Sequence, residues 1–251
     1  MPITEPTPDP SDTLQDLRTD EHEATPAARD DGADDAAGAT TTGSHASIDK
    51  RRGLPLPPFY DDLDGSLRHA WSLLQKGVHV VQSRFHTMAV ATVGLDGAPQ
   101  VRTVVLRGSD TASRQVRFHT DQRSAKFNEL QRNPLISLHF YDPGAKIQLR
   151  LTGEATCHTE GPVWAQAWDA TRPNSRACYR QTVGPGAAID EPFTPETIAR
   201  TDDACAAGQF CAVVVQVTSL EWLYLAARGH RRARFTWSSE GDQRDARWLA
   251  P

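Results

Sequence analysis

Aromatic residues are absent from the start of this 251-residue chain, since residues 1–50 contain no Phe, Trp or Tyr. The same segment holds 12 acidic residues against Arg18, Arg29 and Lys50, which gives a charge of 3 − 12 = −9. Such a composition cannot bury enough apolar surface to offset the entropy of ordering the chain. We therefore predict a disordered acidic tail over residues 1–50 and one folded domain over residues 51–251. The domain keeps 24 of the 27 basic and 20 of the 32 acidic residues, a net charge of 24 − 20 = +4.

Long apolar runs are also lacking, so the sequence predicts no membrane partner. The acidic N-terminus has neither the basic start nor the hydrophobic middle of a secretion signal, which favours a cytoplasmic location. The four cysteines show no CxxC spacing, and we expect buried free thiols and neither a zinc ribbon nor a redox dithiol. The nine histidines form no metal-ligand grouping, so no metal site is predicted. A cluster of arginines over residues 228–234 has no interleaved aromatic residues and is a weak nucleic-acid signal, so no nucleic-acid partner is expected.

The apolar pattern predicts a mainly β domain with a few helices. Helical spacing marks residues 64–83, 124–133 and 161–170, with Ser124 as a possible cap of the second helix. Two hairpins are expected, around Asp96-Gly97 and around Asp142-Pro143-Gly144. Residues 171–208 read as a long loop with one short helix at most. About seven mainly antiparallel strands with few helices favour a closed β-barrel over an open sheet.

The strand VRTVVLRG, residues 101–108, carries two arginines on opposite faces. Alternation places Arg102 with the apolar side chains and Arg107 on the other side. Arg102 is either a strand-end residue that reaches solvent or the partner of an anion beside the apolar face. Lys126, in the first turn of the second helix, is poorly placed for the helix dipole unless a phosphate binds there. A solvated lysine on an exposed helix is the alternative.

Two further polar features are open to either interpretation. Gln148 faces the same way as Arg150 on its strand, where its amide could meet a heteroaromatic edge or solvent. Near the C-terminus, alternation directs Arg232 and Arg234 to one side and Arg231 to the other. Only part of that basic cluster could face a pocket, and a solvated strand end is the alternative.

In this order, the segments resemble the pyridoxamine 5′-phosphate oxidase-like family of FMN-binding split barrels. The resemblance covers about residues 55–251 and rests on RTVVLR (102–107), FHTDQRSAK (118–126), QLRLTGEA (148–155), ARF (233–235) and WLAP (248–251). It implies an antiparallel split β-barrel with a few peripheral helices, a homodimer, and FMN as the cofactor.

The resemblance also implies a set of cofactor contacts, which no single pattern in the sequence would give. The first motif would contact the flavin. The ribityl phosphate would be bound by His119, Thr120, Ser124 and Lys126. Gln148 and Arg234 would contact the ring, and Gln181 would contact the flavin of the partner subunit. The residues of the first motif are Arg102, Thr103, Val104, Val105, Leu106 and Arg107.

Departures from the family pattern concern the substrate. Arg107 stands where a lysine is usual, Ala125 where an arginine is typical, and Tyr224 where a tryptophan is expected. We nominate His230, Arg232 and Arg176 for a small-molecule substrate. Flavin carries the redox chemistry itself, so we expect no catalytic acid or base from the protein. The function predicted is an FMN-dependent oxidoreductase of unknown substrate, with a non-catalytic binder of flavin or another anionic cofactor as the alternative.

Overall fold

A computed structural model describes residues 48–49, 54–194, 200–238 and 244–251. The predicted tail therefore lies almost wholly outside the described residues, and its disorder stays a prediction. Strand β1 (Ile48–Asp49) pairs antiparallel with β2 (Leu54–Pro55), so this short pairing crosses the expected boundary at residue 50.

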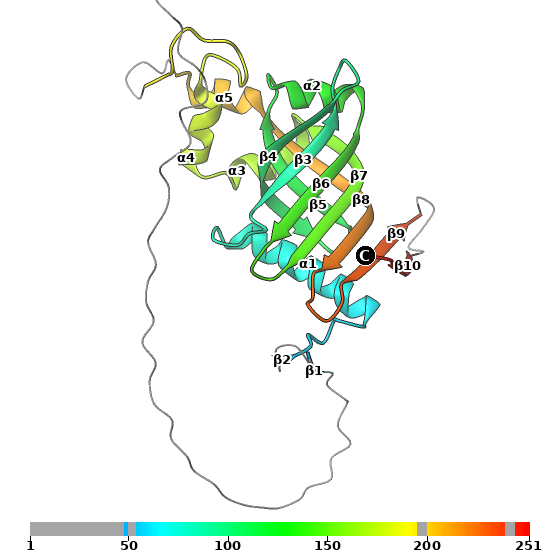
Figure 1. The fold of residues 1–251 in the computed structure, drawn as a ribbon. Coiled ribbons are helices and arrows are strands. Elements are labelled where there is room, and N and C mark those ends of the chain that lie inside the picture. Colours follow the sequence, from blue (N-terminus) through cyan, green and yellow to red (C-terminus); the bar gives the residue numbers. More distant parts are fainter. Residues whose placement is uncertain (1–47, 50–53, 195–199, 239–243) are drawn as a thin grey trace, which may run out of the picture. The chain divides into compact units, whose positions relative to one another are not determined.

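Six antiparallel strands close into a barrel, as the sequence predicted (Figure 1). The ring runs β8-β5-β4-β3-β6-β7 and returns to β8, while β9 and β10 continue the sheet beyond β8. The strands are β3 (Thr87–Val93), β4 (Pro99–Asp110), β5 (Gln115–Asp121), β6 (Leu135–Asp142), β7 (Ile147–His158), β8 (Phe210–Tyr224), β9 (Arg231–Trp237) and β10 (Arg244–Leu249). Both predicted hairpins are present, and Gly97 at the first turn has the positive φ of 84° expected there.

Strand β8 is the longest, with 15 residues, and it spans both ends of the barrel. Its first half pairs with β5, its last residues pair with β9, and β7 pairs along most of its length. Thr120 lies opposite Cys211 near the start of β8, and Gln148 lies opposite Leu223 near its end. Thr120 and Gln148, both predicted site residues, therefore lie near opposite ends of β8.

In the part of the chain that the structure describes, six helical segments lie outside the barrel wall. They are α1 (Leu63–His79), α2 (Ala125–Arg132), α3 (Gly161–Asp169), α4 (Pro173–Arg176), η1 (Ala177–Arg180) and α5 (Asp203–Gln209). The described part of residues 171–208 therefore holds α4, η1 and most of α5, where the sequence predicted a long loop with one short helix. None of the three is long enough to show a helical period, and η1 and α5 are held by tertiary contacts with the aromatic ring of Phe210 and its neighbours.

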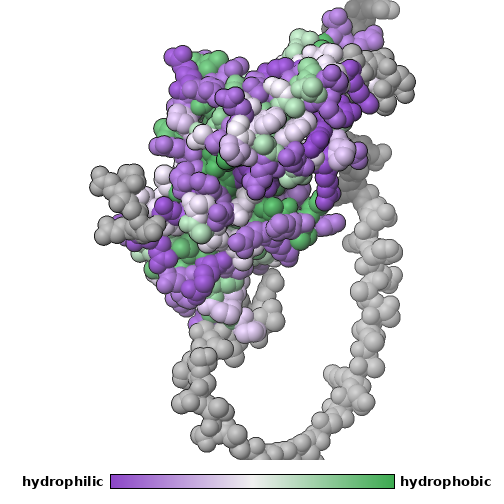
Figure 2. Space-filling view, turned by 180° about the vertical axis from the view of Figure 1, so that it is seen from behind, coloured by the Kyte–Doolittle hydropathy of each residue, from purple (hydrophilic) through white to green (hydrophobic). Residues whose placement is uncertain are grey.

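The core consists of two clusters of buried residues. The larger fills the barrel with alternate residues of each strand, such as Leu106, Phe118 and Trp222, and receives Trp71 and Leu74 from α1. The smaller gathers the apolar side chains of α3 and α5 around Phe210. Figure 2 shows hydrophobic residues in small separate groups on one face, between larger hydrophilic areas.

The four cysteines are free, but they are not all buried. Cys211 is buried and Cys157 is half-buried, whereas Cys178 and Cys205 are exposed. The prediction of buried thiols holds only where a cysteine lies on a barrel strand, because the other two are on short peripheral helices. Across the described ranges, the helices are all too short or too polar to cross a bilayer.

Candidate functional site

Arg102 lies on the inner face of β4 with Val104 and Leu106, as alternation predicted, and forms a partly buried ion pair. Its guanidinium donates to Glu129 Oε2 of α2 at 2.8 Å and to the hydroxyl of Thr92. The Thr92 hydroxyl donates to the same carboxylate oxygen at 2.5 Å. The anion beside the apolar face is therefore a carboxylate of the protein itself. Glu129 was not predicted as a site residue, although its position three residues after Lys126 places both on neighbouring positions of one helix.

Lys126 lies next to hydroxyl groups at the start of α2. Its ammonium donates to Thr120 Oγ1 at 3.2 Å, and Thr120 Oγ1 lies 3.0 Å from Ser124 Oγ. Burial and the nearby Arg102 charge lower the pKa of Lys126, partly offset by Asp121 and Glu129. Two cations are thus close enough to act on one anion.

Ser124 is the N-cap residue of α2, but its hydroxyl does not cap the helix. The hydroxyl donates instead to the carbonyl of Asp121 at 2.6 Å. The prediction was right about the position and wrong about the bond, because the tight turn after β5 offers a closer acceptor. The N–H groups in the first turn of α2 therefore receive no side-chain cap from Ser124, and they face a region that carries Lys126 and two hydroxyls.

Arg107 lies on the outer face of β4, at a β-bulge. The pairing with β5 shifts register between Leu106 and Gly108, so Arg107 has no residue directly opposite. Bulges of this kind redirect a side chain and are frequent next to binding sites. No pattern in the sequence predicted this bulge.

His119 lies on the same outer face and is neutral at pH 7. Burial lowers its pKa to about 3, with further contributions from the charges of Arg117 and Arg107. Its ring meets Phe210 edge-on at 4.7 Å between ring centres, and its buried Nε2 has no hydrogen-bond partner among the described residues. A neutral imidazole with a spare nitrogen can accept or donate one hydrogen bond to a ligand.

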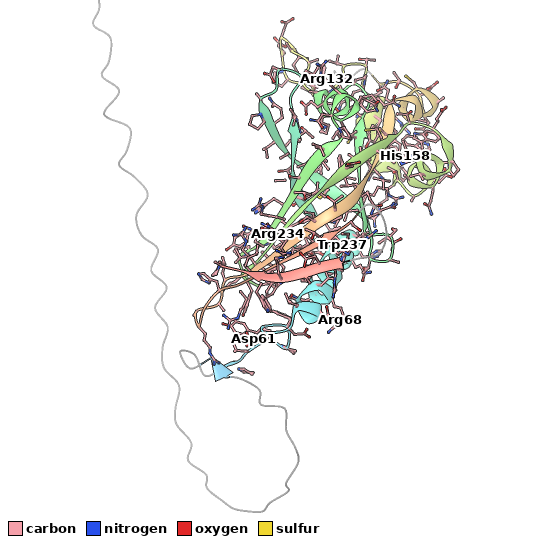
Figure 3. The ribbon with its side chains drawn as sticks, turned by 90° about the vertical axis from the view of Figure 1, so that its right-hand side faces the viewer. Asp61, Arg68, Arg132, His158, Arg234 and Trp237 are labelled. Atoms are coloured by element: carbon pink, nitrogen blue, oxygen red, sulfur yellow. The ribbon has the colours of Figure 1, made fainter. Side chains whose placement is uncertain are left out.

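Gln148 and Arg234 lie at the other end of the barrel from Lys126. Their partners on β8 are Leu223 and Glu221, whereas the partner of Thr120 is Cys211. From Cys211 to Leu223 is 223 − 211 = 12 positions, or about 40 Å of strand at roughly 3.3 Å per residue. Figure 3 shows Arg132, at the end of α2, far along the barrel from Arg234. One chain alone does not bring all the predicted flavin contacts together.

Glu221 organises the far end. It accepts from Arg234 at 2.7 and 2.9 Å, from Arg232 at 2.7 Å and from Arg150 at 3.5 Å. Burial opposes ionisation of this carboxyl, but the hydrogen bonds from Arg232 and Arg234 outweigh it and leave its pKa below the ordinary value. Arg234 and Arg232, which were predicted to contact flavin and substrate, are thus held by Glu221, an acid that was not among the predicted site residues.

The three substrate candidates are not brought together. Arg232 is held by Glu221, and His230 is exposed in the turn before β9. Arg176 lies beside α3, where it donates to the carbonyl of Trp168 at 2.8 Å and stacks over that ring at 4.5 Å. Gln181 lies at the α2 end, where its carbonyl accepts from Arg123 at 2.7 Å. Within the described part of the chain, no group of three or more His, Cys, Asp or Glu side chains could hold a metal ion.

Comparison with known proteins identifies a protein family to which part of this chain is similar. Residues 68–159 match the model of the pyridoxamine 5′-phosphate oxidase FMN-binding domain. This segment of the chain is similar in sequence to the pyridoxamine 5′-phosphate oxidase-like family. The sequence-based resemblance is thereby confirmed, and the matched segment contains Arg102, Thr120 and Lys126.

Among the curated members of this family, a pyridoxine/pyridoxamine 5′-phosphate oxidase of Chromobacterium violaceum is 35% identical over 86 residues. That match covers 34% of this chain and 38% of the relative, so the chain spans well under half the length of this oxidase. A pyridoxine/pyridoxamine 5′-phosphate oxidase 2 of Arabidopsis thaliana is 24% identical over 159 residues, which cover 61% of this chain and 79% of the relative.

Solved structures of related proteins share the fold. An FMN-binding protein of Nostoc punctiforme, described as related to pyridoxamine 5′-phosphate oxidase, matches with a TM-score of 0.58 at 22% identity, over 78% of this chain and 99% of its own. PhzG of Burkholderia lata, solved with tetrahydrophenazine-1-carboxylic acid, matches with a TM-score of 0.60 at 22% identity, over 82% of this chain and 100% of its own. At this identity the two structures establish the split-barrel fold alone.

Proposed function

We propose that this protein binds FMN non-covalently, with the phosphate at the start of α2. The observation that carries the proposal is the contact of Lys126 with the hydroxyl of Thr120, which is itself hydrogen-bonded to Ser124 Oγ, at a helix start that the Ser124 side chain does not cap. A phosphate at that place would gain a charge-assisted bond from Lys126 and bonds from backbone N–H groups. The matching family model, an FMN-binding domain, supports the same ligand.

We further propose a homodimer in which each flavin lies between two subunits. The distance along β8 supports this, because Gln148 and Arg234 can reach a flavin held by Lys126 only if they come from another copy. Large apolar side chains exposed on the outer barrel offer a surface for such contact. They are Val93 on β3, Val101 on β4, and Leu135 and Tyr141 on β6.

The reaction that we propose is FMN-dependent oxidation or reduction of a small molecule. FMN, when bound, supplies the hydride-accepting chemistry. The residues of this chain would bind and orient the cofactor. Lys126 would bind the phosphate, and Gln148 and Arg234 would contact the ring. Arg107 and neutral His119 would contact the groups beside the ring. None of them needs to act as a general acid or base.

Pyridoxamine 5′-phosphate is expected to be a poor substrate. Oxidation requires the substrate phosphate to be clamped so that its reacting carbon lies against the flavin. Here Arg232 is held by Glu221, His230 is exposed, and Arg107 replaces the usual lysine. Oxygen uptake by FMN-loaded protein with pyridoxamine 5′-phosphate and pyridoxine 5′-phosphate tests this. A turnover of about 1 per second or more would contradict it.

Arg232, one of the substrate candidates, is already paired with Glu221, and this supports a second function. In this function the protein binds flavin or another anionic cofactor without turnover. Absorbance spectra after purification identify the bound cofactor, and a screen of electron donors and acceptors separates the two functions. Bleaching of the flavin by a donor under nitrogen, followed by peroxide release in air, supports the oxidoreductase. Bound FMN that no donor reduces supports the binder.

A complementation experiment tests the shared site. Lys126→Ala and Arg234→Ala chains are prepared separately, stripped of flavin, mixed and allowed to exchange subunits. Each parent carries one defect in every site, whereas a mixed dimer has one site with both defects and one intact site. Random exchange should therefore restore tight FMN binding to about one quarter of the sites. No recovery, despite exchange shown by mass spectrometry of differently tagged chains, would contradict a site shared in this way.

A further inference from the structure

Two of the four free cysteines are neighbours on adjacent barrel strands. Cys157 is the last residue but one of β7, Cys211 is the second residue of β8, and these strands pair antiparallel. In this register Cys157 lies opposite Val213, so Cys211 is its diagonal neighbour two positions along. All three side chains point to the inner face and contact the barrel core. The strand pairing thus joins two thiols that are 211 − 157 = 54 positions apart in the sequence.

No redox dithiol was predicted from the sequence, because the cysteines show no CxxC spacing. That spacing is a local signal, and a pair formed across two strands leaves none. The thiols of a diagonal pair on one face of a sheet are within reach of each other, since such neighbours lie about 7 to 8 Å apart at their Cα atoms.

The two thiols differ in access and in acidity. Cys211 has no exposed surface, whereas Cys157 is half-buried and can be reached from solvent. Hydrogen bonding with Cys211 lowers the pKa of Cys157 against the opposing effect of burial, and a hydrogen bond with Gln131 of α2 lowers it further. The interaction with Cys157 and burial raise the pKa of Cys211. The first proton is therefore lost from the accessible sulfur, while the buried one keeps its proton.

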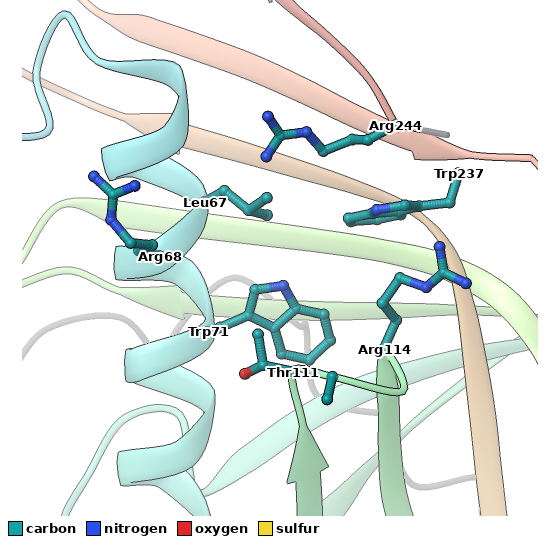
Figure 4. Close-up of a pocket in the computed structure, with 8 residues that line it drawn as sticks. Leu67, Arg68, Trp71, Thr111, Arg114, Trp237 and Arg244 are labelled. Carbon is teal, nitrogen blue, oxygen red and sulfur yellow. The ribbon is translucent and has the colours of Figure 1, made fainter. Parts of the chain in front are cut away.

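The thiol pair is separate from the cavity of about 440 Å³ that lies between α1, the β4–β5 turn, β9 and β10 (Figure 4). The residues that line this cavity include Trp71, Trp237 and Thr111, and no cysteine is among them. Thr111 follows β4 in the turn that leads into β5, whereas Cys211 pairs with Thr120 near the other end of β5. A reagent for the thiols must therefore be small enough to reach Cys157 directly from solvent.

We propose that Cys157 and Cys211 form a thiol pair that reduces hydroperoxides, with Cys157 as the site of oxidation and Cys211 as the resolving thiol. An accessible thiolate beside a second thiol is the arrangement that this chemistry requires. This inference does not depend on flavin binding.

The reaction has two steps. The thiolate of Cys157 attacks one oxygen of the hydroperoxide, so an S–O bond forms, the O–O bond breaks, and the leaving oxygen takes up a proton to give water or an alcohol. The sulfur of Cys211 then attacks the sulfenic acid on Cys157. An S–S bond forms, the S–O bond breaks, and the hydroxyl leaves as water with the proton of Cys211. In total the two thiols lose two electrons and the hydroperoxide gains them.

Closure of the disulfide requires a small backbone movement. A disulfide spans at most about 7 Å between Cα atoms, so a diagonal pair must approach by about 1 Å. Both cysteines lie within two residues of a strand end, where the backbone can adjust more easily than in the middle of the barrel.

The experiment uses the full chain, reduced and then freed of reductant, with hydrogen peroxide as the probe. A short exposure is stopped with catalase, free thiols are counted after denaturation, and peptides are mapped without reduction. We expect the count to fall from four to two, with one new disulfide between the peptides of Cys157 and Cys211. The double variant Cys178→Ser/Cys205→Ser, which lacks both exposed cysteines, is the matched control and should lose its two remaining thiols equally fast.

Single variants establish the order of the steps. Cys211→Ala should stop at a sulfenic acid on Cys157, which dimedone traps, and Cys157→Ser should leave Cys211 reduced. Because Cys211 is in the core, a pulse of iodoacetamide on the wild type gives a second measurement that needs no variant. At pH 7 it should modify Cys157 at least about threefold faster than the more exposed Cys178, since the thiolate is the reactive form.

Three outcomes would overturn the inference. They are a first oxidation at Cys178 or Cys205, oxidation of Cys211 in Cys157→Ser as fast as in the wild type, and slower modification of Cys157 than of Cys178 by iodoacetamide.

Discussion

The two ends of the barrel each use one carboxylate to hold arginine, but they leave different cations for a ligand. At the α2 end, Glu129 is paired with Arg102, while the hydrogen-bond partner of Lys126 among the described residues is the hydroxyl of Thr120. At the β9 end, Glu221 takes Arg232 and Arg234 together. An arriving anion therefore meets an available lysine at the first end and must compete with a carboxylate at the second. We expect the larger part of the FMN affinity to come from the α2 end, and a smaller part, together with orientation of the ring, to come from the β9 end.

Breaking the Arg102–Glu129 pair should have the largest effect on stability. Arg102→Met leaves the carboxylate of Glu129, which is 5% exposed, without its cation. We expect a loss of about 3 kcal/mol in the free energy of unfolding, typical of a buried pair that loses one partner. Urea denaturation of flavin-free protein measures the loss without a contribution from bound FMN.

Arg150→Met is the matched control, because Arg150 is exposed and lies 3.5 Å from Glu221. It should cost less than about 0.5 kcal/mol. Adding Glu129→Gln to Arg102→Met should recover much of the lost stability. An Arg102→Met protein as stable as the wild type would show that Glu129 is not a buried charge that needs its partner.

Removing Lys126 should affect binding more than stability. Lys126→Ala should weaken FMN by about 1 to 3 kcal/mol, the range for a charge-assisted hydrogen bond, while the melting temperature of the flavin-free protein changes little. Quenching of flavin fluorescence on titration measures the affinity. Lys76→Ala, an exposed lysine on α1, serves as control and should bind FMN normally. An unchanged affinity in Lys126→Ala would remove the phosphate from the start of α2.

His119 should make the free energy of unfolding of the protein decrease at acidic pH. Its pKa is about 3 in the folded protein against 6.5 as the ordinary value, so the unfolded chain takes up a proton first as pH falls. The stability it supports is present above pH 6.5 and is lost progressively below it, by about 1 kcal/mol between pH 7.5 and 5.5. Urea denaturation at both pH values should show a smaller loss in His119→Phe. Identical pH dependence of the two proteins would mean that His119 is protonated in the folded state.

Glu221 should give the smallest effect. Its pKa lies below the ordinary 4.5, so the stability it contributes is present above pH 4.5 and is lost as pH falls through the folded pKa. Because the three arginines around it are partly exposed, we expect Glu221→Gln to cost only about 1 kcal/mol at pH 7. The difference from the wild type should shrink below pH 4. A difference that persists there would assign the effect to packing.

Local patterns in the sequence predicted the barrel because strand alternation and turn residues are short-range signals. Arg102 inside and Arg107 outside, and the turn at Gly97, follow directly from period and backbone preference. The bulge at Arg107 could not be predicted, because a register shift depends on two strands at once. Glu129 and Glu221 were missed for a similar reason: each acid gains its role from arginines on other elements, and nothing adjacent in sequence marks the pairing.

The 15 residues of β8 join the two ends, and neighbouring strands pair with nearly all of them. Substitutions at sites so far apart in one chain should add in their effects on unfolding, since neither shares a partner with the other. Binding of a ligand that spans two subunits obeys a different rule, because both contacts are then made to one molecule. For a pair such as Lys126→Ala and Arg234→Ala, the changes in the free energy of unfolding, measured with urea, should therefore be additive. The changes in the free energy of FMN binding, measured by titration, should be non-additive. The difference between the two measurements would report that both residues contact one FMN molecule. It would thus test for the proposed dimer without any determination of molecular mass.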